Sequence, residues 1–380
     1  MRKVFYIILL LSISFFGGCA KSLIKLVVND DTNSYNMFGK YSAREFFVDV
    51  NVSDSLTLLW EQSAYGSFTN SSAVYTDSVV IVSDLGGRIH CFDIRNGKQV
   101  GVLKSKGTVY STPIINKRKL IYALVDNKDD ETELIIYDFF QGKELFTTDI
   151  KGRVLSQMLM DGDDIILATE DGSVKKISSR GKIIWEYESS AKLSCNAAMI
   201  NKTILIGNVE GEIIAINSET GSKLFKKKIG KPFFSGITID GSSAFIGDNS
   251  GILYSFEISN GSINWKFETS SRILMNPAVD DKNVYIGNLS GELFSFNKLT
   301  GTMNWKSYLD GILNSTPLIT KNRIIITNLF KSFSILNKED GTTKKTYDLD
   351  GRGKFSPVLI DNKLIIGYDD GIVRAYEFVY

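Results

Sequence analysis

Histidine, cysteine and proline are scarce in this chain of 380 residues, which holds one histidine, three cysteines and five prolines. The single histidine, His90, leaves no Ser/His/Asp arrangement, and the sequence also lacks a CxxCH haem motif and a phosphate-binding loop. The net charge of +1 gives no support for nucleic-acid binding, which normally requires a strongly basic face. No window shows a helical stripe of apolar residues. These absences point away from a triad hydrolase, a haem protein, a nucleotide-binding enzyme and a nucleic-acid binder.

What the chain does have is a repeat of about 40 residues. The clearest copies are AFIGDNSGILYSFEISNGSINW, which ends at Trp265, and VYIGNLSGELFSFNKLTGTMNW, which ends at Trp305. A marker glycine follows the polar turn at Gly87, Gly172, Gly211, Gly251, Gly291 and Gly371. Thr132 and Lys331 replace this glycine in two further copies. The chain therefore holds eight units.

Within each unit the apolar pattern is that of β-strands. Side chains alternate in residues 292–297, and turns such as NLSG supply the Asn and Gly that tight hairpins need. In the seventh unit we read four strands, at residues 314–319, 323–327, 332–337 and 343–349. Repeats of this length with four strands each predict an all-β fold, an eight-bladed β-propeller of four-stranded antiparallel blades.

The spacing also predicts how the ring closes. Trp305 follows its marker glycine by 14 residues, and the same step from Gly371 passes the C-terminal residue Tyr380. The last blade therefore lacks an outer strand. We expect the segment LTLLWEQ around Trp60 to supply it, because pairing of the two ends leaves no open sheet edge, and the propeller then spans residues 55–380.

Proline placement predicts which strand of a blade lies innermost. Three prolines lie 14 residues before the marker position of their unit, and a fourth fits once the longer hairpin of the second unit is allowed for: Pro277, Pro317, Pro357 and Pro113. Proline has no N–H for a sheet ladder and is confined to edge strands or strand starts. The first strand of each unit is therefore expected to border the central channel.

The N-terminus has the pattern of an export signal over residues 1–18. Arg2 and Lys3 precede a stretch of thirteen apolar or near-apolar residues, 4–16, and two glycines follow that stretch. This stretch is too short to span a bilayer comfortably, which favours export over a permanent transmembrane anchor. In residues 19–54, the Asn, Asp and Ser content predicts a flexible polar tether ahead of the propeller.

The segment FFGGC, which ends at Cys19, resembles the lipobox of bacterial lipoproteins. The resemblance implies that Cys19 carries lipid and becomes the mature N-terminus, although Phe16 stands where the family usually has leucine. Ala20, rather than Asp, follows the cysteine, and the resemblance then implies sorting to the outer membrane. An ordinary signal peptide with an incidental cysteine is the alternative.

Other residues that could carry chemistry have simpler interpretations. Cys91 and Cys195 fall on different blades, so we expect small buried side chains rather than a disulfide. His90 is read as a structural or surface residue rather than a ligand or base. The acidic segment 126–133 lacks the oxygen spacing of a calcium loop and is read as a solvated hairpin tip. The lysines within residues 226–231 protect an edge strand, or alternatively meet anionic lipid or an acidic partner.

The blade ends FNKLTGTMNW, FEISNGSINW, INSETGSKLF and ISSRGKIIW resemble those of the quinoprotein-like (PQQ-repeat) propeller superfamily, in which a Trp packs between blades. Quinoprotein dehydrogenases of that superfamily bind pyrroloquinoline quinone over the channel, with calcium, a catalytic Asp and commonly adjacent cysteines. This chain has no adjacent cysteines and shows no convergent set of carboxylates and amides for calcium. We therefore expect no cofactor.

Taken together, the lipobox, the eight blades and the missing cofactor chemistry resemble the BamB-type lipoproteins of the outer-membrane β-barrel assembly (Bam) complex. The resemblance implies a non-catalytic scaffold on the periplasmic side of the outer membrane, anchored through lipid on Cys19. Its implied partners are a BamA-like barrel assembly protein, other Bam subunits and nascent outer-membrane proteins. The alternatives are a lipid-anchored propeller that binds another partner or ligand, and a PQQ-dependent dehydrogenase.

In that family the partner contacts loops that join the outer strand of one blade to the inner strand of the next. The matching loops here are residues 152–155, 192–194 and 272–274. The implied partner-binding residues are Arg153, Lys192, Leu193, Arg272 and Leu274. Leucines recur near one phase of the repeat, so packing at the base of the inner strand is the alternative for Leu155, Leu193, Leu274 and Leu313.

Overall fold

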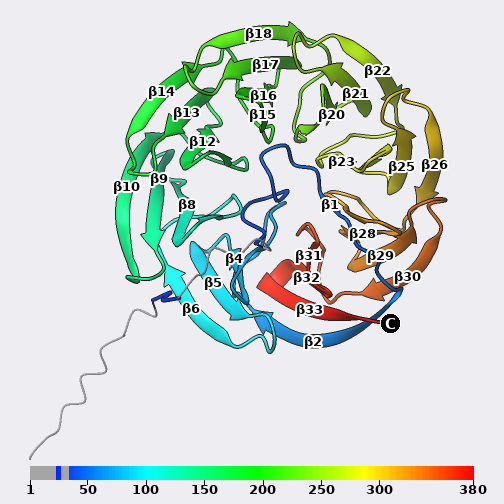
Figure 1. Ribbon diagram of the computed structural model, residues 1–380, viewed down its shortest axis with the longest axis horizontal. Helices are drawn as coiled ribbons and strands as arrows, with labels where there is room; N and C mark the ends of the chain where they lie inside the picture. Colours follow the sequence, from blue (N-terminus) through cyan, green and yellow to red (C-terminus); the bar gives the residue numbers. More distant parts are fainter. Residues whose placement is uncertain (1–22, 27–33) are drawn as a thin grey trace, which may run out of the picture.

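The computed structural model describes residues 23–26 and 34–380, which form a ring of eight β-sheets around a central channel (Figure 1). Seven of these sheets have four strands and one has five. The prediction of an eight-bladed propeller is confirmed. The expected signal peptide, residues 1–18, and Cys19 lie outside the described residues. Within the described ranges, no helix is long and apolar enough to cross a membrane.

In the first seven blades the strands follow one another in chain order across the sheet. The strands of blades one to four are β3 (Val74–Thr76), β4 (Val79–Ser83), β5 (Arg88–Asp93), β6 (Gln99–Lys104); β7 (Ile114–Asn116), β8 (Lys119–Asp126), β9 (Glu131–Asp138), β10 (Lys143–Lys151); β11 (Leu159–Asp161), β12 (Asp164–Ala168), β13 (Ser173–Ile177), β14 (Ile183–Glu188); and β15 (Ala198–Ile200), β16 (Thr203–Gly207), β17 (Glu212–Asn217), β18 (Lys223–Lys228).

Blades five to eight repeat this arrangement, and the last one takes its outer strand from the N-terminal part of the chain. Their strands are β19 (Thr238–Asp240), β20 (Ser243–Gly247), β21 (Ile252–Glu257), β22 (Ile263–Glu268); β23 (Ala278–Val279), β24 (Asn283–Gly287), β25 (Glu292–Asn297), β26 (Met303–Tyr308); β27 (Leu318–Thr320), β28 (Arg323–Asn328), β29 (Ser332–Asn337), β30 (Thr343–Asp348); and β31 (Val358–Ile360), β32 (Lys363–Tyr368), β33 (Ile372–Val379), β2 (Ser55–Ser63). A short 3₁₀ turn, η1 (Asp369–Gly371), joins β32 to β33.

The first strand of each blade borders the channel, as the prolines predict. Inner strands of neighbouring blades contact one another, and Figure 1 shows β15, β23 and β31 around the centre. The inner strand of blade seven is shorter than expected, because β27 begins only after Pro317. Proline cannot donate to the ladder, and residues 314–317 lie outside the sheet.

Burial follows the layering of the blades. The middle strands are apolar and buried on both faces, as in β20, because the neighbouring blades cover them. The outer strands alternate between half-buried and exposed side chains, as in β22. Each blade therefore packs its faces against its neighbours and leaves one side of the outermost strand in water.

Tryptophan and glycine join neighbouring blades at the rim. The indole N–H of Trp305 donates to the carbonyl of Lys338 in the next blade at 3.0 Å, and its ring lies against Gly341. A Cβ on Gly341 would lie 2.5 Å from the indole, and the residue has φ of +70°, so glycine is required twice over. Equivalent indole hydrogen bonds join the other tryptophans to the following blade, namely Trp60, Trp185 and Trp265.

Ring closure is also confirmed. β2 pairs antiparallel with β33 along its length, with Leu56 opposite Phe378 and Ser63 opposite Ile372. Trp60 therefore supplies both the missing strand of blade eight and an indole contact to blade one, since its N–H reaches the carbonyl of Ile94 at 2.8 Å. The two ends of the chain thus lock the last blade to the first.

The prediction of a flexible tether is wrong for the described residues from 34 onward. Residues 35–52, which we call the plug segment, run through the channel along the inner strands (Figure 1). Tyr35 pairs with Tyr75 of blade one, and inner strands of further blades donate backbone N–H groups to the segment. These bonds come from Ile115, Met199, Ile239, Val279, Ile319 and Lys321. Close to its end, β1 (Phe47–Val48) pairs in parallel with β27.

The physical reason is that an inner strand leaves one row of backbone groups unpaired at the channel. Such groups must find partners when water is excluded. The plug segment supplies carbonyls for them and also buries apolar side chains, including Met37, Phe38 and Phe46. Its Asn and Ser content suggests a linker, but the clusters NMFG and EFFV within it are apolar.

Arg44 holds the centre of the plug segment and is fully buried. Its guanidinium donates to four backbone carbonyls: those of Ala197 at 2.5 Å, Phe38 at 2.7 Å, and Gln157 and Met158 at 3.0 Å each. Burial lowers the pKa of Arg44 to about 9, so the side chain stays charged at neutral pH. One side chain therefore ties the plug segment to blades three and four.

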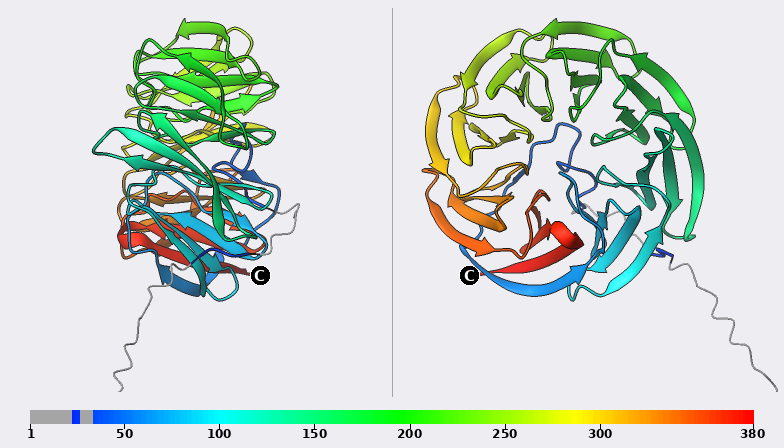
Figure 2. Two further views of the ribbon diagram at one scale, coloured as in Figure 1. Left: turned by 90° about the vertical axis from the view of Figure 1, so that its left-hand side faces the viewer. Right: turned by 180° about the vertical axis from the view of Figure 1, so that it is seen from behind.

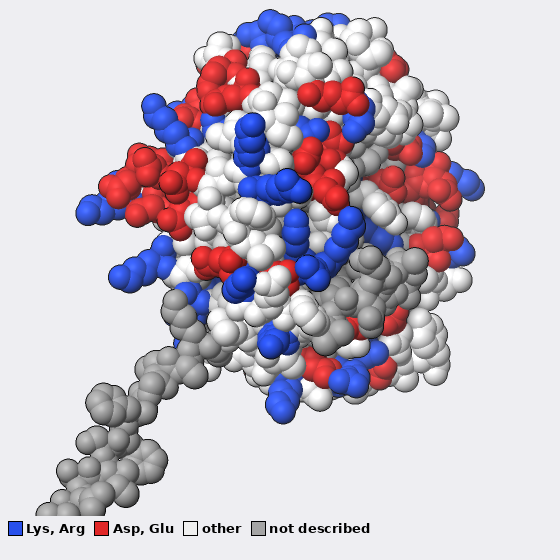
Figure 3. Space-filling model, turned by 60° about the vertical axis from the view of Figure 1, so that its left-hand side comes forward, with Lys and Arg blue, Asp and Glu red and all other residues white. Residues whose placement is uncertain are grey.

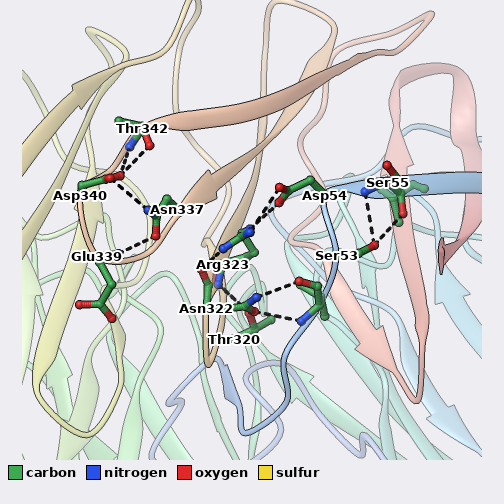
Figure 4. Close-up of polar contacts among 12 residues, drawn as sticks. Ser53, Asp54, Ser55, Thr320, Asn322, Arg323, Asn337, Glu339, Asp340 and Thr342 are labelled. Carbon is green, nitrogen blue, oxygen red and sulfur yellow. Dashed lines mark hydrogen bonds and ion pairs between the residues drawn. The ribbon is translucent and has the colours of Figure 1, made fainter. Parts of the chain in front are cut away.

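The plug segment leaves the channel between blades seven and eight (Figure 4). Asn322 exchanges two hydrogen bonds with the backbone of Val52, each at 2.9 Å, and Arg323 forms an ion pair with Asp54. The chain then enters β2. This exit couples the plug segment directly to the strand that closes the ring.

Candidate docking face

The loops that join an outer strand to the next inner strand lie on one face of the ring, which we call the docking face. Each loop is held by the middle hairpin of the blade that it enters. Backbone N–H groups of Glu170, Val209 and Leu289 donate to the carbonyls of Arg153, Lys192 and Arg272, at 2.8, 3.1 and 3.0 Å respectively. The predicted contact loops therefore have a common, fixed geometry set by the repeat.

Two of the predicted contact residues, Arg153 and Lys192, come together on one carboxylate. Glu170 forms an ion pair with Arg153 and lies 3.6 Å from the Lys192 ammonium, while Asp130 lies 3.4 Å from Arg153. The hydrogen bond with Glu170 raises the pKa of Arg153. The side chain of Lys192 is 64% exposed. These groups line a surface hollow of about 450 Å³ between blades two, three and four.

The third predicted cation, Arg272, stands apart from this cluster. Its Nε donates to the side-chain oxygen of Asn249 at 2.7 Å, and its side chain is exposed. Asn249 lies in the middle hairpin of blade five, whereas Glu170 lies in that of blade three. The docking face therefore carries two separate basic positions rather than one continuous patch.

The recurring leucines divide between packing and exposure. Leu193 is 2% exposed and Leu313 is fully buried, so for these two leucines the alternative of packing at the base of the inner strand holds. Leu155 and Leu274 are half-buried and line the mouth of the channel. Of the predicted apolar contacts, Leu274 is therefore available on the docking face, whereas Leu193 packs inside a blade.

At the centre of the docking face the channel opens into a cavity of about 240 Å³. Phe38 of the plug segment belongs to its wall, and the other lining residues come from the blades: Thr69, Asn70, Tyr110, Leu155, Ser156, Gln157, Ser194, Asn196, Phe234, Leu274, Met275, Asn276, Asn314 and Thr316. The lining contains no Lys, Arg, His, Asp or Glu. It therefore combines carboxamides and hydroxyls with apolar and aromatic side chains.

The fold raises the possibility of a quinone cofactor at this position. Pyrroloquinoline quinone carries several carboxylates and needs cations, whereas the cavity lining offers none. Cofactor and drug-sized ligands generally occupy pockets of roughly 300–1,000 Å³, which exceeds the present cavity. Among the described residues, no group of three His, Cys, Asp or Glu side chains is arranged to hold a metal. The residues at the channel mouth do not fit that cofactor.

The remaining candidate residues have structural roles. His90 is buried between Asp84 and Gln99, at 3.1 and 3.0 Å from its two ring nitrogens. Cys91 and Cys195 are buried free thiols, as expected. Residues 223–228 form the outer strand β18, which confirms an edge position for Lys226, Lys227 and Lys228, whereas Lys231 follows the strand.

The acidic segment predicted as a hairpin tip joins β8 and β9. This hairpin projects beyond its neighbours in the side view (Figure 2), and acidic side chains gather on the part that projects in Figure 3. Its tip residues Asp129 and Asp130 are exposed and border the hollow that holds Arg153. The enlarged hairpin thus contributes one wall of the docking face.

Sequence reasoning missed two features of this face. Glu170 was not singled out, although the loop that carries it hydrogen-bonds to the Arg153 loop in the same way as its counterparts in other blades. The carboxamides of the cavity were also missed, although Asn196, Asn276 and Asn314 recur at intervals close to the repeat. Repeat spacing was the signal that could have found them.

Comparison with known proteins places the fold. A sequence model of the family described as outer membrane protein assembly factor BamB matches residues 123–235, 196–267 and 249–378, which together exceed half of the chain. The structure of BamB from Moraxella catarrhalis aligns with a TM-score of 0.72 at 17% identity, over 85% of this chain and 100% of that chain. No curated protein matches this chain.

Two further solved structures share the architecture at low identity. Quinohemoprotein alcohol dehydrogenase from Comamonas testosteroni aligns with a TM-score of 0.76 at 11% identity, over 91% of this chain and 80% of that one. The computationally designed Ika8 protein aligns at 0.75 and 13% identity, over 86% and 100%. Identities this low show the fold alone. The family match extends through most of the propeller, and this chain therefore belongs to the BamB family of outer membrane protein assembly factors.

Proposed function

We propose that this protein is a non-catalytic scaffold of the outer-membrane β-barrel assembly complex, held at the periplasmic side of the outer membrane by lipid on Cys19. The observation that carries the proposal is the match of the propeller to the BamB family in three overlapping segments. Its partners are a BamA-like barrel assembly protein and other Bam subunits, and it assists nascent outer-membrane proteins.

The docking face supplies the contact residues in this proposal. Arg153, Lys192, Arg272 and Leu274 lie on loops whose backbone is fixed by neighbouring hairpins, so a partner meets a preformed surface. The ion pair between Arg153 and Glu170 is partly exposed, and such pairs contribute only about 0–1 kcal/mol. A carboxylate from the partner can therefore replace Glu170 at small cost.

Copurification tests the proposal. A tagged chain isolated from detergent-solubilised envelopes is expected to recover the BamA-like protein. Reversing two charges with Arg153→Glu and Lys192→Glu should lower recovery at least fivefold, because truncation of interface hot spots typically costs more than about 1 kcal/mol. Lys223→Glu on the exposed edge of β18 is the matched control and should leave recovery unchanged.

The possible results test the scaffold function and the proposed contact residues separately. Failure of the unaltered chain to recover the partner, under conditions that recover other subunits, would reject the scaffold function. Full recovery with the doubly reversed chain would keep the scaffold but reject this contact site. The dehydrogenase alternative predicts instead that added quinone and calcium support reduction of an artificial acceptor by alcohols or sugars.

A further inference from the structure

The carboxamides around the channel mouth form a linked belt. Gln157 donates through its side chain to the carbonyl of Asn70 at 3.2 Å, and its backbone N–H donates to the side chain of Asn196 at 3.0 Å. Asn196 in turn donates to Asn276 at 3.0 Å, and Asn70 donates to Asn314 at 3.0 Å. The belt crosses five blades and carries no charge.

The hydrogen bond between the side chains of Asn70 and Asn314 leaves one acceptor and one donor of this pair without a partner among the described residues. Asn70 donates through Nδ2 and Asn314 accepts through Oδ1. In the described part of the chain, no hydrogen bond uses Oδ1 of Asn70 or Nδ2 of Asn314, and both residues line the cavity. One free acceptor beside one free donor is the complement of another amide, which offers one N–H and one C=O.

The charges around the cavity limit which ligands it can bind. Arg44 places a buried positive charge behind the cavity wall: it does not line the cavity, but it lies 5.5 Å from the ring centre of Phe38, which does. Because Arg44 does not line the cavity, it cannot donate a hydrogen bond to an anion there, but its charge still repels a cation. Burying a charged group in this lining is costly without a partner. An uncharged polar group fits the cavity best.

Size limits the ligand to the tip of a larger molecule. The cavity volume of about 240 Å³ lies below the roughly 300–1,000 Å³ of pockets that hold whole small-molecule ligands. That space admits one or two side chains and not a whole cofactor. The apolar and aromatic rim, with Tyr110, Leu155, Phe234 and Leu274, surrounds the opening and can cover the flanks of the inserted tip.

The channel already holds one polypeptide turn, which belongs to the plug segment and forms part of the cavity wall. Residues 37–44 of the plug segment turn sharply, with the N–H of Lys40 bonded to the carbonyl of Met37, and insert Phe38 into the cavity wall. Blade residues bind this turn mainly through main-chain groups. The inner walls of this channel thus bind a polypeptide turn through their own main-chain groups.

We propose that the channel-mouth cavity binds an uncharged turn of a docked polypeptide, through a main-chain amide or an Asn or Gln side chain paired with Asn70 and Asn314. This inference extends the proposed function, since the turn would belong to a partner on the docking face. A peptide experiment measures the cavity by itself, so it can fail while docking on the surrounding loops stands.

The test uses methyl-labelled full chain and three short hairpin peptides whose turn is Asn-Gly, Asp-Gly or Lys-Gly. NMR methyl signals of Leu155 and Leu274 report on the cavity, and exposed Leu224 and Leu299 on the outer rim are the controls. We expect the Asn-Gly peptide to shift the cavity signals alone. The two charged peptides should bind at least tenfold more weakly, with Lys-Gly the weakest.

One variant probes the free donor. Asn314→Asp keeps the acceptor that Asn70 uses and replaces the free amino group with a charged oxygen, so binding of the Asn-Gly peptide should weaken at least tenfold. Asn304→Asp, at an exposed position on β26, should change nothing. Equal affinity for all three peptides, shifts only at the outer rim, or no shift at millimolar peptide would overturn the proposal. Binding of methyl glucoside in place of the peptides would overturn it in favour of a sugar site.

Discussion

Arg44 offers the sharpest test of the plug segment. We expect Arg44→Ala to release residues 35–52 from the channel while the propeller stays folded. The guanidinium makes four hydrogen bonds to carbonyls on blades three and four and on the plug segment itself. No other described side chain ties this segment to the ring through as many bonds.

The free-energy change expected for Arg44→Ala combines favourable hydrogen bonds with the unfavourable burial of a charge. Hydrogen bonds to a charged group contribute about 1.5–3 kcal/mol each, and burial of the cation costs several kcal/mol. Removal of the side chain leaves four carbonyls that lose their donor, each at about 1–3 kcal/mol before water enters. We therefore expect a net loss of about 3–5 kcal/mol for seating the plug segment, similar to the cost of removing one partner of a buried charge pair.

Hydrogen exchange measures this loss directly. Amides bonded between the plug segment and the inner strands, such as those of Met199, Ile239 and Val279, should exchange at least a hundredfold faster in Arg44→Ala. Lys40→Ala removes a positive charge from the same segment, where the ammonium faces the ring of Tyr41 and makes no hydrogen bond to a described blade, and should leave exchange unchanged. Equal exchange in the two variants would refute the role assigned to Arg44.

Three further predictions concern stability and anchoring. Gly341→Ala should lower the free energy of unfolding by about 1–3 kcal/mol more than Gly241→Ala in urea titrations, because both residues have positive φ but only the former would clash with Trp305. Burial alone would raise the pKa of Asp161, but hydrogen bonds from Lys176, Lys202 and Ser218 outweigh it and lower the pKa to about 2. Its stabilisation of about 2 kcal/mol is present above pH 4 and is lost as pH falls toward 2, so Asp161→Asn should weaken the protein at pH 7 and flatten the acid limb. Asp163→Asn, at an exposed carboxylate paired with Lys117, should have a smaller effect. Cys19→Ser should move the protein from the membrane fraction to the soluble fraction, and unchanged partition would contradict lipid anchoring.

The propeller could be predicted because its determinants repeat. Marker glycines such as Gly291 need positive φ, and a Cβ there would lie 2.3 Å from the backbone oxygen of Leu309, just after the outer strand, so the same residue recurs at the same phase. Lys331 keeps the conformation with φ of +61° without being glycine. Strand closure by Trp60 followed from counting alone.

The plug segment could not be predicted in the same way, because it occurs once. Its Asn and Ser residues have the composition of a linker, and its role depends on the unpaired edges that the inner strands of several blades present to the channel. Phe38, Arg44 and Phe46 do not repeat, and nothing in the pattern of a single sequence places them in the channel. A run of two aromatics in an expected tether, Phe46 and Phe47, was the available warning.

The candidate site was predicted in part, for a related reason. The repeat located the loops of Arg153, Lys192 and Arg272, but it could not say which side chains meet across blades. Arg153 and Lys192 share one ion-pair partner, Glu170, which belongs to a different loop of the repeat. Leu274 and Leu193 have similar positions in the repeat, but Leu274 lines the channel mouth whereas Leu193 is buried.

The central claim, that this face of the propeller docks on the barrel assembly machinery, is tested most directly by site-specific photo-crosslinking in envelopes. A photoreactive residue is placed either at Lys192, on the docking face, or at Leu224, which is 51% exposed on the outer strand β18. The account predicts a crosslink to the BamA-like protein from position 192 and none from position 224. A crosslink from position 224 alone, or from neither position while the complex is intact, would contradict it.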